Sequence, residues 1–497
     1  MNSNKGVKRF LEIIPGGLSW GIIFSLAALA VYRPVVCALI ILVFDFYWII
    51  RTVYLTTLLI LAHRKLAKER KKDWLAACRR LPENKNWQGI YHLILFPVYK
   101  EEIGILRASL EALKQTHYPK DKMIVVMAFE ERHKPSKLTA KTLQGEFKNE
   151  FFEYLTTFHP DGIGGEAATK GANATWAAKH AKEAILKNGI PLDSVIVSCF
   201  DADTCVDRGY FGCLSHHFFT NPKPHQASYQ PIPVYNNNIW YAPSFARVVE
   251  ISASFCQMIE GMRLEKFVTF SSHSMSFKTL VDIDYWPTDM VSDDSVVYWK
   301  AFIFFKGDYR VIPLYATVSM DAAYSSNIFK TIAVQYRQKR RWAWGVENFP
   351  FVVSRFMNNP DIGFLIKLRR SFHLLESHVT WAIWAIIIVI IAPLPIFWGG
   401  VVFNQLPIGY NLSRLTGLLF NFTLGTSIVW IVLSRTILPP RPKDIRWIKS
   451  AFLIVEWIVV PFVILVLGST PALDAQTRLM LAKHMQFFPT EKTRKVV

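Results

Sequence analysis

The chain has 497 residues, of which 51% are hydrophobic, and its formal net charge is +19. This length would allow two or three soluble domains, but the apolar share indicates that part of the chain lies in lipid. The basic residues flank the apolar runs, which is typical of contacts with membrane lipids and anionic substrates, so we expect no nucleic-acid partner. The six cysteines form no Cys-x-x-Cys pair and predict reduced thiols.

The apolar residues are concentrated in five runs toward the two ends of the chain: 17–32, 34–62, 377–398, 413–433 and 450–468. Because about 20 helical residues cross a bilayer, we expect five spans, of which the first is short. Basic residues before the first run suggest a cleavable signal peptide as one alternative. The second run follows with almost no loop, however, which favours a retained hairpin.

Clusters of Lys and Arg at 64–72 and 435–449 are expected to be cytoplasmic by the positive-inside rule, together with the large middle region. Five spans would leave the basic tail 469–497 outside. Either this tail lies on the membrane surface as an amphipathic helix, or the segment Pro393-Leu394-Pro395 breaks a span and changes the count. The chain is thus predicted to be an integral multi-pass protein of the plasma (inner) membrane.

The middle region predicts a doubly wound α/β sheet. Apolar segments at 91–98, 123–129 and 194–200 have the composition of buried parallel strands. Helical patterns at 101–116 and 171–188 lie between them, as in βαβ units. The stretch 144–171 is interpreted as an insertion with a flexible loop. In such sheets ligands bind beyond the carboxyl ends of the strands.

Two pairs of carboxylates are candidates for chemistry. Asp201 and Asp203 follow the third predicted strand, and in an extended conformation both can face one side. They could hold Mg²⁺ or Mn²⁺ together with substrate phosphates, or simply form a turn. Asp293 and Asp294 precede a predicted helix, where one can cap the helix while the other accepts a proton.

Two helical segments are candidates for binding. Lys170, with the backbone amides that follow it and Asn173, opens a helix and could meet a phosphate or ribose, although a plain helix start has the same pattern. Gln338, Arg341 and Trp342 fall at i, i+3 and i+4 and share one helix face, where they could close over a sugar and an anionic leaving group. The alternative is a basic helix face with an interfacial Trp.

In their order along the chain, these motifs resemble those of membrane-embedded family 2 glycosyltransferases, the class that includes cellulose, chitin and hyaluronan synthases. The matching segments are Phe96-Pro97-Val98-Tyr99-Lys100-Glu101, Lys170-Gly171-Ala172-Asn173, Asp201-Ala202-Asp203, Ser292-Asp293-Asp294 and Gln338-Lys339-Arg340-Arg341-Trp342. The resemblance implies a GT-A fold, a nucleotide-diphosphate sugar donor, Mg²⁺ or Mn²⁺, and inversion at the anomeric carbon.

The resemblance also implies roles for individual residues. Asp203 would bind the metal and Asp201 the metal or the donor, while Asp294, next to Asp293, would be the catalytic base. The donor nucleotide would be bound by Pro97, Tyr99, Glu101, Glu130, Lys170 and Asn173. The acceptor and the diphosphate would be bound by Gln338, Arg341 and Trp342.

Two positions depart from the family pattern. The second strand usually ends in Asp, but here it ends Phe129-Glu130-Glu131, and the usual Thr-Glu-Asp is Ser292-Asp293-Asp294. The second motif still ends in Asp, so the residue expected to act as the base is present as Asp294. The choice of donor is the property that these departures leave most open.

We therefore expect five regions: an N-terminal transmembrane hairpin (1–62), a cytosolic GT-A domain (63–345), an interfacial amphipathic segment (346–376), C-terminal transmembrane helices (377–468) and a basic amphipathic tail (469–497). The predicted function is metal-dependent, inverting transfer of a sugar from a nucleotide donor to a growing polysaccharide. Two alternatives are a single transfer to a polyprenyl phosphate or glycolipid, and a catalytically silent scaffold or transporter. The sequence names no protein partner.

Overall fold

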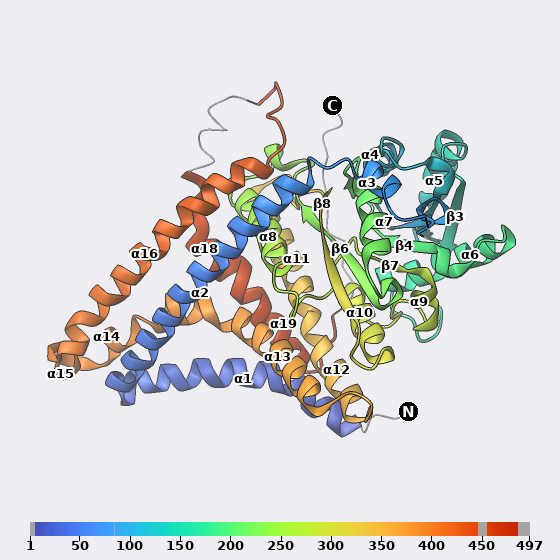
Figure 1. Cartoon of the computed structure of the whole chain (residues 1–497). Coiled ribbons are helices and arrows are strands. Elements are labelled where there is room, and N and C mark those ends of the chain that lie inside the picture. Colours follow the sequence, from blue (N-terminus) through green and yellow to red (C-terminus); the bar gives the residue numbers. More distant parts are fainter. Residues whose placement is uncertain (1–4, 84, 446–454, 486–497) are drawn as a thin grey trace.

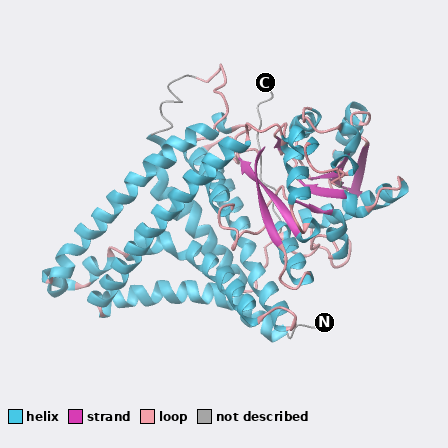
Figure 2. Cartoon of the chain, viewed as in Figure 1, coloured by secondary structure: helices cyan, strands magenta, loops and turns pink. Residues whose placement is uncertain are grey.

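A computed structural model describes residues 5–83, 85–445 and 455–485 of the chain. All strands described lie in one domain formed by the middle of the sequence, and long helices from the two ends of the chain lie beside it (Figure 1 and Figure 2). This arrangement confirms the predicted α/β domain between N-terminal and C-terminal apolar helices.

The sheet has eight strands in the order β3-β2-β1-β4-β7-β6-β8-β5. The strands are β1 (Tyr91–Val98), β2 (Met123–Glu130), β3 (Glu153–His159), β4 (Val195–Cys199), β5 (Cys205–Val206), β6 (Ala227–Val234), β7 (Ser274–Ser276) and β8 (Arg310–Ser319). β3, β2, β1 and β4 are mutually parallel, whereas β7 pairs antiparallel with both β4 and β6. The three strands expected from the sequence are β1, β2 and β4.

An edge strand lies where an insertion was expected. β3 pairs in parallel with β2 within the stretch 144–171, so the interpretation of that stretch as an insertion outside the sheet was wrong. Four of its seven residues are only partly buried, and two of these four, Glu153 and Thr156, are polar. An edge strand packs on fewer neighbours than a central one, so it lacks the continuous apolar run that identifies the central strands.

The two faces of the sheet bury alternate residues of each strand, as the period of two requires. On β1, Ile94 and Phe96 join the core beneath α4, α5 and α7, whereas Leu93 and Leu95 join the core beneath α6, α9 and α10. These helices are α4 (Ile103–Lys114), α5 (Ser136–Phe147), α6 (Lys170–Lys187), α7 (Tyr210–Thr220), α9 (Phe277–Asp282) and α10 (Asp293–Phe304). α3 (Trp74–Arg79), which precedes β1 in the chain, packs on α7.

The parallel register brings the ends of β1, β2 and β4 to one edge of the sheet. Val98 pairs with Phe129, and Leu95 pairs with Cys199. The residues that follow each strand therefore meet at this edge, which is where the sequence placed the ligand site.

Four helical segments are long and apolar enough to cross a membrane within the described part of the chain: Lys5–Tyr32, Pro34–Glu69, Phe364–Ile391 and Val455–Met480. They contain α1 (Lys5–Tyr32), α2 (Pro34–Glu69), α13 (Phe364–Ile386), α18 (Val460–Ile464) and α19 (Thr470–Met480). The expected span at 413–433 lies in α16 (Pro407–Ile437), which packs along α2. Residues 446–454, which begin the last expected span, lie outside the described residues.

The other α-helices described lie between the domain and this group or, for the last two named, within the group itself. They are α8 (Ser244–Glu260), α11 (Ile328–Ala343), α12 (Asn348–Met357), α14 (Leu394–Trp398) and α15 (Gly400–Gln405). The segment 346–376, expected at the interface, holds α12, in which six of ten residues are buried, and the start of α13, where Phe364, Leu365 and Phe372 are exposed. The tail region 469–497 begins with α19, which packs against α1, α11 and α13.

Candidate active site

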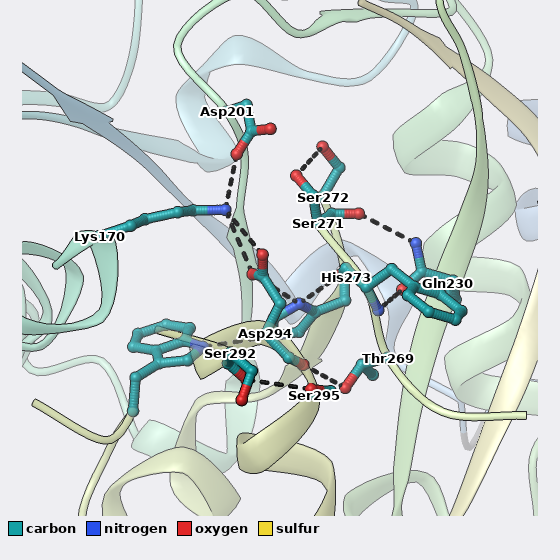
Figure 3. A network of polar contacts seen from close by, with 12 residues as sticks. Lys170, Asp201, Gln230, Thr269, Ser271, Ser272, His273, Ser292, Asp294 and Ser295 are labelled. Carbon is teal, nitrogen blue, oxygen red and sulfur yellow. Dashed lines mark hydrogen bonds and ion pairs between the residues drawn. The ribbon is translucent and has the colours of Figure 1, made fainter. Parts of the chain in front are cut away.

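Three charged side chains meet beyond the ends of the parallel strands. Lys170 opens α6, Asp201 follows β4, and Asp294 lies in the first turn of α10. The Nζ of Lys170 lies 2.7 Å from Oδ1 of Asp201 and 3.2 Å from Oδ1 of Asp294 (Figure 3). Burial lowers the pKa of Lys170, but the carboxylates of Asp201 and Asp294 more than offset this, so the pKa lies well above its ordinary value. Lys170 is thus a fixed cation between two carboxylates.

Asp203 occupies a different position from Asp201. Its side chain is fully buried, and its Oδ2 accepts the backbone N–H of Asp321 at 2.7 Å. The Asp201 side chain, by contrast, is 26% exposed and faces Lys170. Within the described residues no three His, Cys, Asp or Glu side chains gather as a metal site. The donor set still fits Mg²⁺ or Mn²⁺, which bind through one or two carboxylates and complete their shell with substrate phosphates.

The two carboxylates of the Ser292-Asp293-Asp294 segment also differ. Burial raises the pKa of Asp293 well above its ordinary value, and the charge of Asp294 adds to this. The Asp294 side chain is 22% exposed and faces Lys170. No side-chain cap forms at the start of α10, and the hydroxyl and backbone N–H of Ser292 both donate to Glu347. Asp294 is therefore the better placed of the two to meet a substrate.

At the end of β1, Tyr99 lies between two cations. The Lys100 ammonium and the Arg132 guanidinium lie 4.8 Å and 4.4 Å from the centre of its ring. The carboxylate of Glu101 accepts the backbone N–H of Tyr99 at 2.8 Å and so fixes the turn. Pro97 pairs with β2, and it lies beyond the last residue of β1 that pairs with β4. The N–H that proline lacks therefore interrupts no hydrogen bond between β1 and β4. The geometry gives this end of the candidate site a half-buried aromatic ring beside positive charge.

Glu130 and Asn173 are the two predicted nucleotide contacts that lie deepest. Glu130 is 4% exposed and lies 3.2 Å from Arg132 and 3.4 Å from His159. Asn173 is 2% exposed, and its amide donates to the Ala128 carbonyl at 2.7 Å. This hydrogen bond joins α6 to the end of β2. Asn173 therefore has a structural role, in addition to the nucleotide binding predicted for it.

The segment Gln338–Trp342 lies in the last turns of α11, as the sequence indicated. The Trp342 ring lies 5.7 Å from that of Tyr235 and 3.6 Å from the ammonium of Lys339. The charge of Arg341 makes a small contribution that lowers the pKa values of Tyr235 and Asp293, against the larger effect of burial. Gln338 is buried, and no hydrogen bond to its Oε1 occurs within the described chain. Polar and aromatic groups thus lie together on this side of the candidate site.

Several residues near the site escaped the sequence reasoning. Tyr235 follows β6, His273 precedes the three-residue strand β7, and Glu250 lies on α8. None of them belongs to a motif with recognisable spacing. One signal was available for His273, since it stands in the polar segment Ser271-Ser272-His273-Ser274 between apolar stretches.

Comparison with protein families places these features in one class. The family described as Glycosyl transferase family group 2 matches residues 196–467, which is more than half of the chain. The chain belongs to this family. It is therefore a nucleotide-sugar glycosyltransferase, and the resemblance inferred from its motifs is confirmed at that level. The matched region holds Asp201, Asp203, Asp294 and the segment Gln338–Trp342.

Solved structures of distant proteins resemble this glycosyltransferase. One is the mannosyltransferase PcManGT from Pyrobaculum calidifontis in complex with GDP-Man and Mn²⁺, with 13% identity, 80% of this chain and 98% of that chain covered, and a TM-score of 0.42. Another is TarS 1-349 from S. aureus in complex with UDP-GlcNAc, with 14% identity, 71% and 93% covered, and a TM-score of 0.37. Comparison with curated proteins finds no significant match.

Proposed function

We propose that this chain is a membrane-embedded, inverting glycosyltransferase that moves a sugar from a nucleotide-diphosphate donor to a growing polysaccharide. The observation that carries the proposal is the position of Asp294. Its carboxylate lies at the start of α10, partly exposed, and shares Lys170 with Asp201. A base that accepts the proton of an acceptor hydroxyl must be accessible to that hydroxyl, and the partial exposure of Asp294 supports this role.

The donor would bind along the ends of β1, β2 and β4. In this proposal Tyr99 and Glu101 hold the nucleoside, with Pro97, Glu130 and Asn173 shaping the pocket behind them. Lys170 and Arg341 would stabilise the charge that develops on the leaving diphosphate. Mg²⁺ or Mn²⁺, held through Asp201 and Asp203, would when bound neutralise part of the same charge.

The acceptor would enter from the side of α11. A sugar ring has apolar C–H faces, and the paired rings of Trp342 and Tyr235 offer a flat surface on which such a face can pack. The buried amide of Gln338 would bind a hydroxyl of the same acceptor. Because α11 packs on α19, this end of the cleft adjoins the candidate membrane helices.

The proposed setting is the plasma (inner) membrane, with the catalytic domain in the cytoplasm. Lys65, at the basic end of α2, places its ammonium 4.2 Å from the ring centre of Tyr315 on β8, and Arg70 donates to Thr317. The basic cluster thus contacts the catalytic domain. By the positive-inside rule this supports a cytoplasmic domain.

The test is sugar incorporation by washed membranes supplied with labelled nucleotide sugars and Mn²⁺ or Mg²⁺. We expect Asp294→Asn to lose incorporation by about 100-fold or more, because it removes the base. Asp289→Asn is the control, since Asp289 is an exposed carboxylate in the loop that precedes α10. Equal incorporation by the wild type and Asp294→Asn would overturn the assignment of the base.

The length of the product distinguishes the two forms of transfer. A ladder of oligomers or a polymer is expected for polysaccharide synthesis. A single added sugar on a polyprenyl phosphate or glycolipid would replace that part of the proposal with single transfer. Nucleotide-sugar binding without turnover would instead indicate a silent domain.

A further inference from the structure

We propose that Glu347 is a positioning residue that fixes Asp294 relative to α11, the helix that carries the proposed acceptor site. Its Oε1 accepts the backbone N–H of Ser292 at 2.8 Å and the hydroxyl of Ser292 at 2.7 Å. Ser292 directly precedes α10, whose first turn contains Asp294. The inference rests on the proposed function, in which Asp294 is the base and the acceptor binds beside α11.

Glu347 belongs to the same continuous helical segment as the side chains of the proposed acceptor site. The short 3₁₀ helix η6 (Trp344–Glu347) follows α11 without a loop. The backbone N–H of Trp344 bonds to the carbonyl of Arg340, so helical hydrogen bonds continue across the junction. A change in the position of the Gln338–Trp342 segment would therefore move Glu347 with it.

Both carboxylate oxygens of Glu347 act as acceptors. The indole N–H of Trp344, which can only donate, lies 2.9 Å from Oε2. Trp344 is 1% exposed and belongs to a buried apolar cluster with residues of α1, α13 and α19. One oxygen is thus bound to a ring that is packed among the candidate membrane helices, and the other oxygen holds Ser292. A carboxylate bound at both oxygens has little freedom to rotate.

The next residue in the chain makes a second contact with α10. Asn348, which is 4% exposed, donates its side-chain amide to the hydroxyl of Ser295 at 2.7 Å. The Ser295 hydroxyl donates in turn to the Ser292 carbonyl at 3.0 Å, and Figure 3 shows this contact beside Asp294. The residues on both sides of the Asp293-Asp294 pair are thus held from the end of η6 and the start of α12.

This arrangement would set the distance between the base and the acceptor. A hydroxyl bound beside α11 must lie within hydrogen-bond reach of the base for its proton to be accepted. A displacement of about 1 Å between reacting groups can cost about 100-fold in rate. The donor would bind at the ends of β1, β2 and β4, which Glu347 does not hold in place. Loss of Glu347 is therefore expected to lower turnover and to leave donor binding nearly unchanged.

The experiment compares Glu347→Gln with Glu347→Leu in the full-length protein purified in detergent, using the labelled nucleotide sugar that wild-type membranes incorporate. The amide oxygen of Gln can still accept from Ser292, which offers two donors, but its NH₂ group then faces the indole N–H of Trp344. Leu accepts from neither partner. Both variants should therefore unfold at a lower temperature than wild type.

Turnover is expected to separate these two variants. We expect kcat to fall about tenfold or more in the Leu variant and to stay within about threefold of wild type in the Gln variant. The KM for the donor should stay within about twofold of wild type in both. If Glu347 served stability alone, folded protein of both variants would turn over at the wild-type rate.

Asp73→Ala is the control for a lost hydrogen bond at the start of a helix. Oδ1 of Asp73 accepts the backbone N–H of Ala76 at 2.9 Å, where α3 begins. α3 packs on α7, and α7 lies on the opposite face of the sheet from α10. This variant should unfold at a lower temperature than wild type and keep kcat within about twofold.

Three outcomes would contradict the proposal: wild-type kcat in the Leu variant, equal loss of kcat in the Leu and Gln variants, or an effect confined to KM. Thermal unfolding and nucleotide-sugar binding identify a variant that has failed to fold. If the Leu variant does not fold, Glu347→Asp takes its place, because its carboxylate is one methylene shorter and cannot reach both partners.

Asp294→Asn is assayed in parallel. If that variant keeps its activity, the proposed base is wrong. An inactive Asp294→Asn beside a fully active Glu347→Leu removes only the role of Glu347.

Discussion

Asp474, on α19, lies 2.8 Å from the guanidinium of Arg340, within the Gln338–Trp342 segment of α11. The same carboxylate accepts from the Tyr336 hydroxyl at 3.2 Å and from Arg478 at 2.7 Å. The helix that carries the proposed acceptor site is thus bound to the last candidate membrane helix. A change in the position of α19 would be transmitted to the cleft through this contact.

Replacing Asp474 by Ala is expected to destabilise the protein by about 1 kcal/mol and to lower turnover several-fold, because α11 loses a charge-assisted bond. The pair is partly exposed, with side-chain exposures of 22% for Arg340 and 24% for Asp474, so screening by solvent keeps the effect modest. Unfolding temperature and turnover in detergent are the measurements. Arg478→Ala, which removes another partner of the same carboxylate, should leave turnover near wild type.

A double-mutant cycle of Arg340→Ala and Asp474→Ala measures the interaction between these two side chains separately from their contacts with other residues. We expect the two single changes to be non-additive in unfolding free energy. Strict additivity would show that Arg340 and Asp474 do not act on each other in solution.

Sequence reasoning found the strands whose residues are buried on both faces. β1, β2 and β4 are continuous apolar runs, and this is the signal that central parallel strands give. β6 is equally buried, but Pro231 and Pro233 interrupt it, and proline within a run argues against a strand. β7 has only three residues. β6 and β7 therefore gave no local signal of a central strand.

The candidate site divides in the same way. The order of the motifs pointed to Asp201, Asp294 and the Gln338–Trp342 segment, because each belongs to a short run of characteristic residues that can be recognised in the sequence. His273 lies 21 positions before Asp294, and Asp474 pairs with Arg340 across 134 positions. Partners that only the tertiary fold brings together leave no periodic pattern in the sequence, so they could not be predicted.

Gly171 provides a test of the close approach between α6 and the loop before α10. A Cβ at this position would lie 2.5 Å from the Pro287 carbonyl oxygen and 2.8 Å from Cβ of Asp293. Gly171→Ala must therefore displace α6 or the segment that carries Asp294. We expect a loss of about 1–3 kcal/mol in stability and a larger fall in turnover than in donor affinity.

Gly145→Ala is the matched control for Gly171→Ala. Gly145 lies inside α5, and nothing lies within 4 Å of the position of a Cβ there. Alanine is favoured over glycine inside a helix by about 1 kcal/mol, so this variant should be as stable as wild type or more stable. Stability is read from unfolding in detergent. A Gly171→Ala protein with wild-type stability and turnover would refute the tight contact.

Lys339 predicts a dependence of stability on pH. Burial lowers its pKa to about 8, and the charge of Glu250 only partly offsets this. In the unfolded chain lysine keeps its ordinary pKa of about 10.4, so between these values the unfolded state binds a proton that the folded state has released. Stability then rises with pH across this window, because it increases wherever the unfolded state binds more protons. Below pH 8 the folded state carries the full cost of a buried ammonium.

The measurement is the difference in unfolding temperature between wild type and Lys339→Met at a series of pH values from 7 to 10. Methionine keeps the apolar stem in place and does not titrate. We expect the unfolding temperature of wild type to rise relative to that of the variant as pH rises above 8. Other groups titrate equally in both proteins and do not change this difference. A difference that stays constant, or that falls with pH, would show that Lys339 keeps an ordinary pKa and that its ammonium on the Trp342 ring reaches water.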